Sequence, residues 1–125
     1  VMERYPNIKF YLSHGGAFPA SYAARMDHVY GARIDGRQKI YKKPSTYLKK
    51  FYFDTLVFSV DQLEFLIKKY GADHVAIGTD YPADMAEHDP VEHVYQVESI
   101  TEDEREKICG LNALRLLNLS ESDFK

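Results

Sequence analysis

Two residues whose side chains can do acid–base or metal chemistry each follow a short apolar run. His14 comes just after residues 8–12, and Asp80 comes just after residues 74–78. An imidazole titrates near neutral pH, so His14 can bind a metal or act as a general acid or base. A carboxylate such as Asp80 can bind a divalent cation or accept a proton from bound water. The alternatives are structural, because His14 can hydrogen-bond the sheet edge and Asp80 can belong to a turn.

The apolar runs alternate along the chain with segments of helical pattern. Strands are expected at 8–12, 51–55 and 74–78, and helices at 20–32, at 44–48, at 59–70, from 89 and from 101. Strands that alternate with helices pair in parallel through right-handed crossovers, which predicts the α/β class. The carboxyl ends of parallel strands meet at one edge of a sheet. We therefore expect His14, Asp54 and Asp80 to lie on the same rim.

Helix boundaries are marked by capping residues. Ser59 with Gln62, and Thr101 with Glu104, have the spacing of a capping box, and Gly71 ends the first of these helices. The helix that Ser59 begins carries one apolar stripe at helical spacing, made of Leu63, Leu66, Ile67 and Tyr70. These signals mark the start of the helix after the second strand and the start of the last helix.

Other polar residues have plainer interpretations. Asp54 either orients a ligand or caps the end of a strand, and we favour the structural role. An acidic and histidine-containing cluster follows Asp80 and lacks the zinc-protease spacing, so we interpret it as a solvated loop: Glu87, His88, Asp89 and His93. A basic run is interpreted as solvated rather than as a phosphate or RNA contact: Lys39, Lys42, Lys43, Lys49 and Lys50. Cys109 is expected in the core.

Composition limits the classes of protein that are possible. The chain has 125 residues, of which 45% are hydrophobic and 28% charged, and a net charge of −3. It is long enough for one domain but too short for a complete eightfold barrel, which needs roughly 200 residues or more. The charge speaks against nonspecific nucleic-acid binding, and no apolar run reaches the roughly 18 residues of a membrane helix. With Cys109 alone no internal disulfide can form, which favours a cytoplasmic location.

A family resemblance rests on motifs that recur in a fixed order. They are His14-Gly15-Gly16-Ala17-Phe18-Pro19, Arg25, Pro44-Ser45 with Tyr47-Leu48, Tyr52-Phe53-Asp54-Thr55, Gly78-Thr79-Asp80-Tyr81-Pro82 and Asn112-Ala113 with Arg115-Leu116-Leu117. Each motif alone is weak, but the ordered set resembles the C-terminal half of the amidohydrolase-2 group of the amidohydrolase superfamily. That group includes decarboxylases of the aminocarboxymuconate-semialdehyde and resorcylate types.

The resemblance implies a fold and a site. Residues 1–125 would be the C-terminal half of a single (β/α)₈ TIM-barrel domain, with a divalent metal, usually zinc, at its carboxyl rim. Asp80 matches the family's metal-binding aspartate and His14 its catalytic histidine. Arg25 matches an arginine that grips the substrate carboxylate, often across a dimer interface. The sequence has no H-x-H, so the remaining metal ligands are expected in an N-terminal half outside it.

Three functions remain open from the sequence. The first is a metal-dependent decarboxylase, a lyase acting on a small carboxylated cyclic or muconate-like substrate. The second is a metal-dependent hydrolase of a lactone or an amide. The third is an inactive half-barrel that binds a partner. In each case we expect a chain that is part of a longer barrel, forms homo-oligomers and binds neither nucleic acid nor membrane.

Overall fold

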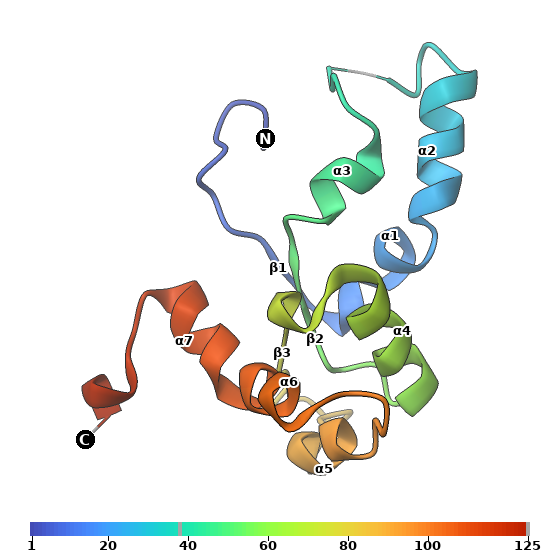
Figure 1. Ribbon diagram of the computed structural model, residues 1–125. Coiled ribbons are helices and arrows are strands. Elements are labelled where there is room, and N and C mark those ends of the chain that lie inside the picture. The colour runs from blue at the N-terminus through green and yellow to red at the C-terminus, as the bar shows by residue number, and fades with distance from the viewer. Residues whose placement is uncertain (38, 125) are drawn as a thin grey trace.

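The computed structural model describes residues 1–37 and 39–124, and its centre is a three-stranded parallel sheet (Figure 1). The strands lie in the order β1 (Tyr11–Leu12), β2 (Tyr52–Asp54), β3 (Val75–Ala76). Tyr11 is in register with Tyr52, and Phe53 with Val75. The parallel α/β arrangement confirms the fold class, and the three strands occur where the apolar runs predict them.

Each strand is shorter than its apolar run. The ladder ends early because neighbouring backbone groups find other partners. The amide of Ile77 donates to the carbonyl of Ile108, 3.1 Å away, instead of extending β3. The strand ends are therefore set by contacts with helices and turns, which a local pattern of apolar residues does not contain.

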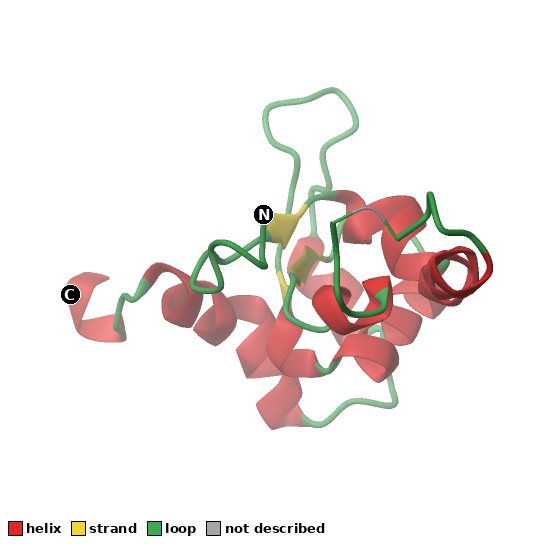
Figure 2. Cartoon of the chain, turned by 90° about the horizontal axis from the view of Figure 1, so that it is seen from above, coloured by secondary structure: helices red, strands yellow, loops and turns green. Residues whose placement is uncertain are grey.

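The helices lie beside and below these short strands in the view of Figure 2, and loops lie above them. Their bounds are α1 (Ala17–Ser21), α2 (Ala23–Ala32), α3 (Pro44–Leu48), α4 (Val60–Tyr70), α5 (Pro90–Tyr95), α6 (Glu102–Glu106) and α7 (Asn112–Leu117). A π-helical turn, Lys107–Leu111, joins α6 to α7. Single 3₁₀ turns occur at His14–Gly16, Ala72–His74 and Glu121–Phe124.

The segment expected as one helix at 20–32 is two helices. Tyr22 lies between α1 and α2 with φ −109° and ψ 28°, outside helical geometry. The prediction of a single helix was wrong because nothing in its composition marks this change of direction. The first helix also begins earlier, directly after the two glycines at 15 and 16.

The capping residues act largely as predicted. The Ser59 side chain accepts from the Gln62 amide, and Thr101 with Glu104 forms a complete capping box. The Gln62 side chain does not return to Ser59, because it donates to Ser21 Oγ at 3.3 Å. The first capping box is therefore only half formed, and Gln62 instead joins α4 to α1.

Two apolar clusters fill the interior. The larger is formed by residues from α4 to the π-helical turn: Leu63, Ile67, Ala72, Val75, Val94, Val97, Ile100 and Ile108. The smaller contains Ala20, Phe53 and Leu66. Cys109 is partly buried against the larger cluster, in keeping with a core position, and burial raises the pKa of its thiol. Within residues 1–37 and 39–124, no helix has the length and apolar character needed to cross a membrane.

Candidate functional site

His14 and Asp80 face each other across the carboxyl ends of β1 and β3. His14 Nε2 lies 3.9 Å from Asp80 Oδ2, and both side chains are exposed to solvent. The two residues line the same cavity, which has a volume of about 430 Å³. The parallel sheet therefore brings together the two residues that the sequence placed on one rim. Their chemical roles stay predictions.

His14 stands on a turn of unusual backbone geometry. Residues 14 to 17 all have positive φ, from 42° to 71°. A side chain at Gly15 would place its Cβ 2.4 Å from Val57 Cγ1, and one at Gly16 would lie 2.7 Å from the Phe53 ring. Glycine is needed at both places because the left-handed backbone and the close packing exclude a Cβ. The two glycines of the motif thus fix the direction from which His14 enters the cavity.

A buried carboxylate holds that turn. Asp54 is 4% exposed and is the last residue of β2. Its Oδ2 accepts the His14 amide at 2.9 Å, while Oδ1 accepts the amides of Gly15 at 2.7 Å and Leu56 at 3.1 Å. Hydrogen bonds to an ionised acceptor are stronger than neutral ones. Asp54 therefore positions His14, which agrees with the structural role favoured from the sequence.

The segment that carries Asp80 is tied to the same aspartate by close packing. A Cβ at Gly78 would lie 2.6 Å from the Asp54 Cβ, so only glycine fits at this point of the strand end. The Gly78 amide donates to Thr55 Oγ1 at 3.3 Å. Two residues later Asp80 has φ 57°, which turns its carboxylate out of the strand direction. Asp54 thus contacts both arms of the site, the turn that carries His14 and the segment that carries Asp80.

The cavity between His14 and Asp80 has one mainly apolar wall. Leu56, Val57, Phe58 and Met85 line it, and Ser21 and Gln62 add a polar edge. A pocket of this kind, mostly apolar with a few convergent polar groups, suits a small organic molecule with one charged substituent.

Arg25 does not line this cavity. It lies on α2 and is exposed to solvent. Nearby on α1 and at the α1–α2 junction, Phe18 and Tyr22 stack with ring centroids 4.9 Å apart, and both are exposed. Arg25 and this aromatic pair thus belong to an outward-facing surface rather than to the site formed by His14 and Asp80.

One residue of the acidic and histidine-containing cluster differs from the sequence interpretation. His93 is not in a solvated loop: it lies in α5, is 8% exposed, and its Nδ1 is 3.9 Å from a Glu87 carboxylate oxygen. The prediction was wrong because His93 packs beside Val94 on the inner side of α5. His88 and Asp89 are exposed as expected. The five lysines of the basic run are exposed as well.

Tyr11 also supports the strand ends that carry the site, although no sequence motif singled it out. Its hydroxyl lies 3.1 Å from the Ala76 carbonyl and 3.0 Å from the Ile77 carbonyl, reaching from β1 to the end of β3. Burial, together with the negative charge of Asp54, raises the pKa of this phenol well above its usual range. The hydroxyl therefore remains protonated and able to donate. Tyrosine is common in strands, so its type alone does not indicate this role. The contact becomes visible only once β1 and β3 lie in one sheet.

The residues fit part of a metal site. Asp80 presents a solvent-accessible carboxylate to the cavity, and Asp54 does not compete because its oxygens already accept three backbone amides. Among the residues that the structure describes, no three histidine, cysteine, aspartate or glutamate side chains come close enough together to hold an ion. This chain thus offers one oxygen ligand, with His14 close by.

The matches with known proteins agree with these motifs. A model of the amidohydrolase family matches residues 1–119. The chain belongs to the amidohydrolase family. The 2-amino-3-carboxymuconate-6-semialdehyde decarboxylase of Dictyostelium discoideum is 33% identical to this amidohydrolase chain, over 99% of this chain and 35% of its own length. The protein of the same name from Caenorhabditis elegans is 27% identical, over 98% and 31%.

Solved structures resemble this amidohydrolase chain closely. The 5-carboxyvanillate decarboxylase of Sphingomonas paucimobilis superposes with a TM-score of 0.82 at 28% identity, covering 95% of this chain and 36% of that one. A dihydroxybenzoic acid decarboxylase from a Polaromonas species, solved with manganese and the inhibitor 2-nitroresorcinol, gives 0.80 at 28%, covering 99% and 38%. The chain therefore spans about a third of the length of the curated relatives it matches, where the resemblance implied half of a barrel.

Proposed function

We propose that this chain carries part of the active site of a metal-dependent decarboxylase acting on a small carboxylated cyclic or muconate-like substrate. The observation that carries the proposal is the pairing of His14 with Asp80, 3.9 Å apart, in the lining of one cavity. The names of the two curated relatives and of the Sphingomonas and Polaromonas enzymes support decarboxylation as the reaction class. The three strands would be the last three of an eight-stranded barrel.

His14 is the proton donor in this proposal. Its imidazolium gives a proton to the substrate carbon that bears the carboxylate. The carbon–carboxylate bond then breaks, carbon dioxide leaves, and the electron pair of that bond restores the conjugated system. The neutral imidazole takes a new proton from water, so that one proton is consumed for each carbon dioxide released. The turn fixed by Asp54 aims the imidazole at that carbon.

Asp80 is the metal ligand in this proposal. A divalent ion bound here would polarise the substrate's oxygens and stabilise negative charge on them. The other ligands would come from residues outside this sequence. Zinc is the metal that the resemblance implies, whereas the Polaromonas relative was solved with manganese. A carboxylate ligand suits manganese well, so we propose a divalent ion and test both.

Arg25 binds the substrate of a second copy of the chain in this proposal. Its exposure on α2, beside the stacked Phe18 and Tyr22, is the arrangement expected if a second copy covers this surface. The guanidinium would then hold the substrate carboxylate of the neighbouring copy by two hydrogen bonds. A homo-oligomer is thus part of the proposed function.

The deciding experiment uses the intact protein, stripped of metal and supplied with Mn²⁺ or Zn²⁺, with 2,6-dihydroxybenzoate and a muconate-type substrate as probes. We expect carbon dioxide release that depends on added metal. His14→Asn should lower kcat by about 10²–10⁴-fold, the contribution of a general acid. His88→Asn is the matched control, because His88 is exposed and lines neither the cavity nor the strand ends.

Two results would overturn the proposal. Ring opening of a lactone or amide substrate without carbon dioxide release would favour the hydrolase instead. Metal binding without turnover of any carboxylated probe would favour the inactive binding module.

A further inference from the structure

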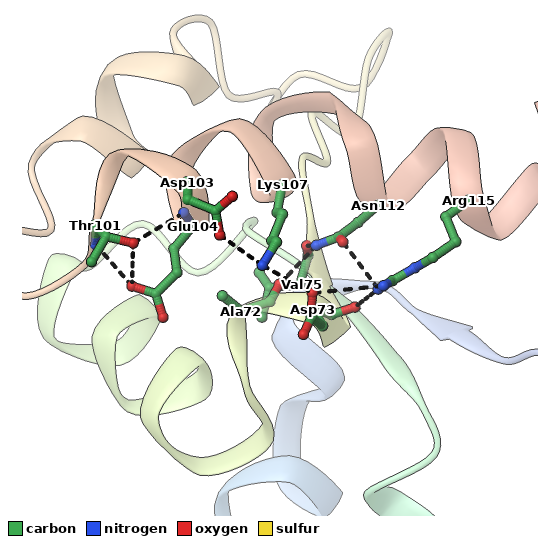
Figure 3. A network of polar contacts seen from close by, with 9 residues as sticks. All are labelled: Ala72, Asp73, Val75, Thr101, Asp103, Glu104, Lys107, Asn112 and Arg115. Atoms are coloured by element: carbon green, nitrogen blue, oxygen red, sulfur yellow. Dashed lines mark hydrogen bonds and ion pairs between the residues drawn. The ribbon is translucent and has the colours of Figure 1, made fainter. Parts of the chain in front are cut away.

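The motif at 112–117, which forms part of the family resemblance, does not line the cavity. The structure places it against the segment that leads to Asp80 (Figure 3). Asn112 is 1% exposed, and its side-chain amide donates to the carbonyls of Ala72 and Val75, both at 2.7 Å. An asparagine amide has two N–H donors, so one residue satisfies both carbonyls. Asn112 is thus a buried clamp on the start of β3.

The π-helical turn provides a second hold on the same strand. The Asn112 backbone amide bonds to the carbonyl of Lys107, five residues earlier, rather than to Ile108. The carbonyl of Ile108 is therefore left without its helical partner. It accepts the amide of Ile77 at 3.1 Å, at the end of β3. π-Turns within α-helices often lie at functional sites, and here the irregularity creates the acceptor.

Charged side chains surround the clamp at its solvent edge. Arg115 donates to the Asp73 carbonyl at 2.6 Å and to Asn112 Oδ1 at 3.1 Å (Figure 3). Lys107 pairs with Asp103 at 2.7 Å and lies 3.7 Å from Asp73. The Arg115 contact fixes which end of the Asn112 amide points toward β3. Arg115 therefore connects the Asn112 side chain to the segment just before β3.

These contacts all hold residues 72–77, the segment that ends three residues before Asp80. We propose that Asn112 is a positioning residue: together with the Ile108 carbonyl that the π-turn frees, it sets where β3 ends and so holds Asp80 opposite His14. The structural part of the proposal stands on these hydrogen bonds. Its consequence for metal binding and catalysis rests on the proposed function of Asp80.

The test compares Asn112→Ala with Leu48→Ala in the intact protein. Leu48 is 5% exposed on α3, so its truncation weakens the fold without touching β3. In Asn112→Ala we expect the Ile77 amide to exchange with solvent at least tenfold faster. We also expect Mn²⁺ affinity to fall at least tenfold, the size seen for groups that orient metal ligands, and kcat to fall while KM changes less than twofold. In Leu48→Ala the Mn²⁺ affinity, kcat and KM should stay near the wild-type values, and the Ile77 amide should exchange no faster than the other buried amides of that variant.

Arg115→Ala provides a milder variant if Asn112→Ala does not fold, because Arg115 is exposed. We expect the same changes at about a third of the size. Unchanged Ile77 exchange in either folded variant, or faster exchange with unchanged Mn²⁺ affinity and kcat, would overturn the proposal. If the wild type neither binds Mn²⁺ nor releases carbon dioxide, the proposed function fails, and Ile77 exchange still decides whether Asn112 holds the strand.

Discussion

The two arms of the site, the turn that carries His14 and the segment that carries Asp80, rest on different supports. The arm that carries Asp80 stands on β3, whose Val75 belongs to a core cluster of eight buried residues. The arm that carries His14 stands beside a cluster of only three, Ala20, Phe53 and Leu66. His14 is instead fixed by the Asp54 carboxylate, which accepts the amides of His14 and Gly15. The Asp80 arm thus rests on the larger apolar core, with Asn112 and the Ile108 carbonyl hydrogen-bonded to its backbone, whereas the His14 arm depends mainly on the hydrogen bonds of one buried carboxylate.

The difference suits the role that we propose for each arm. A metal ligand needs a fixed position, and a broad core gives one because many contacts must be lost before the strand moves. A proton donor needs its side chain free to approach the substrate, and His14 remains exposed while its backbone is held. The hydrogen bonds from Asp54 therefore hold the His14 backbone in place although only a small apolar cluster packs beside it.

The sharpest test of the comparison is a pair of substitutions on one helix. Leu63 and Leu66 both lie on α4 with no exposed surface, but Leu63 belongs to the larger cluster and Leu66 to the smaller. Leu63→Ala should cost about 3–5 kcal/mol of unfolding free energy and Leu66→Ala about 2–3 kcal/mol, because the cost grows with the cavity that remains. Urea unfolding measures both. Equal costs would show that the two cores are equally rigid.

The second test removes the charge that holds the His14 arm. Asp54→Asn keeps the shape but leaves only one oxygen to accept backbone amides, so we expect a loss of about 2–3 kcal/mol of stability. Misplacing His14 by about 1 Å should lower kcat about 10²-fold in the decarboxylase assay. Asp61→Asn is the matched control, since Asp61 is an exposed carboxylate on α4. A fall in kcat of similar size in both variants would remove the special role of Asp54.

The smallest expected effect concerns the contact between α2 and α3. Asp27 on α2 accepts the amide and hydroxyl of Ser45 at 2.9 and 2.6 Å, which docks α3. Desolvation alone would raise its pKa, but the Ser45 hydrogen bonds, helped by the charge of Lys43, outweigh it and hold the pKa below its usual value. A lowered folded-state pKa adds stability above the unfolded-state pKa, and this stability is lost as pH falls through the folded-state pKa.

The measurement compares the wild type with Asp27→Asn across pH. Their difference in unfolding free energy should be constant above about pH 5, no more than about 1 kcal/mol for so accessible a group, and should vanish in strong acid. A difference that persists unchanged at low pH would mean that shape rather than charge docks α3.

The local signals in the sequence proved reliable where a feature depends only on residues close to it in the sequence. The cap at Ser59, the capping box at Thr101 and the buried stripe of α4 depend on neighbours within a few residues, and the structure has them. The break at Tyr22 and the burial of His93 depend on what lies across the fold. Tyrosine occurs within helices as well as between them, and histidine occurs in exposed as well as buried positions, so no local pattern could predict either feature.

Residue types and their order determined the chemistry that this chain can offer. His14 and Asp80 follow parallel strands, and parallel strands bring their carboxyl ends to one edge; the family follows from the ordered motifs. Only the tertiary structure decided that Asp54 holds the His14 turn and that Asn112 holds β3. These partners lie about 40 residues from the groups they bind. Such long-range hydrogen bonds exist only after the elements have packed.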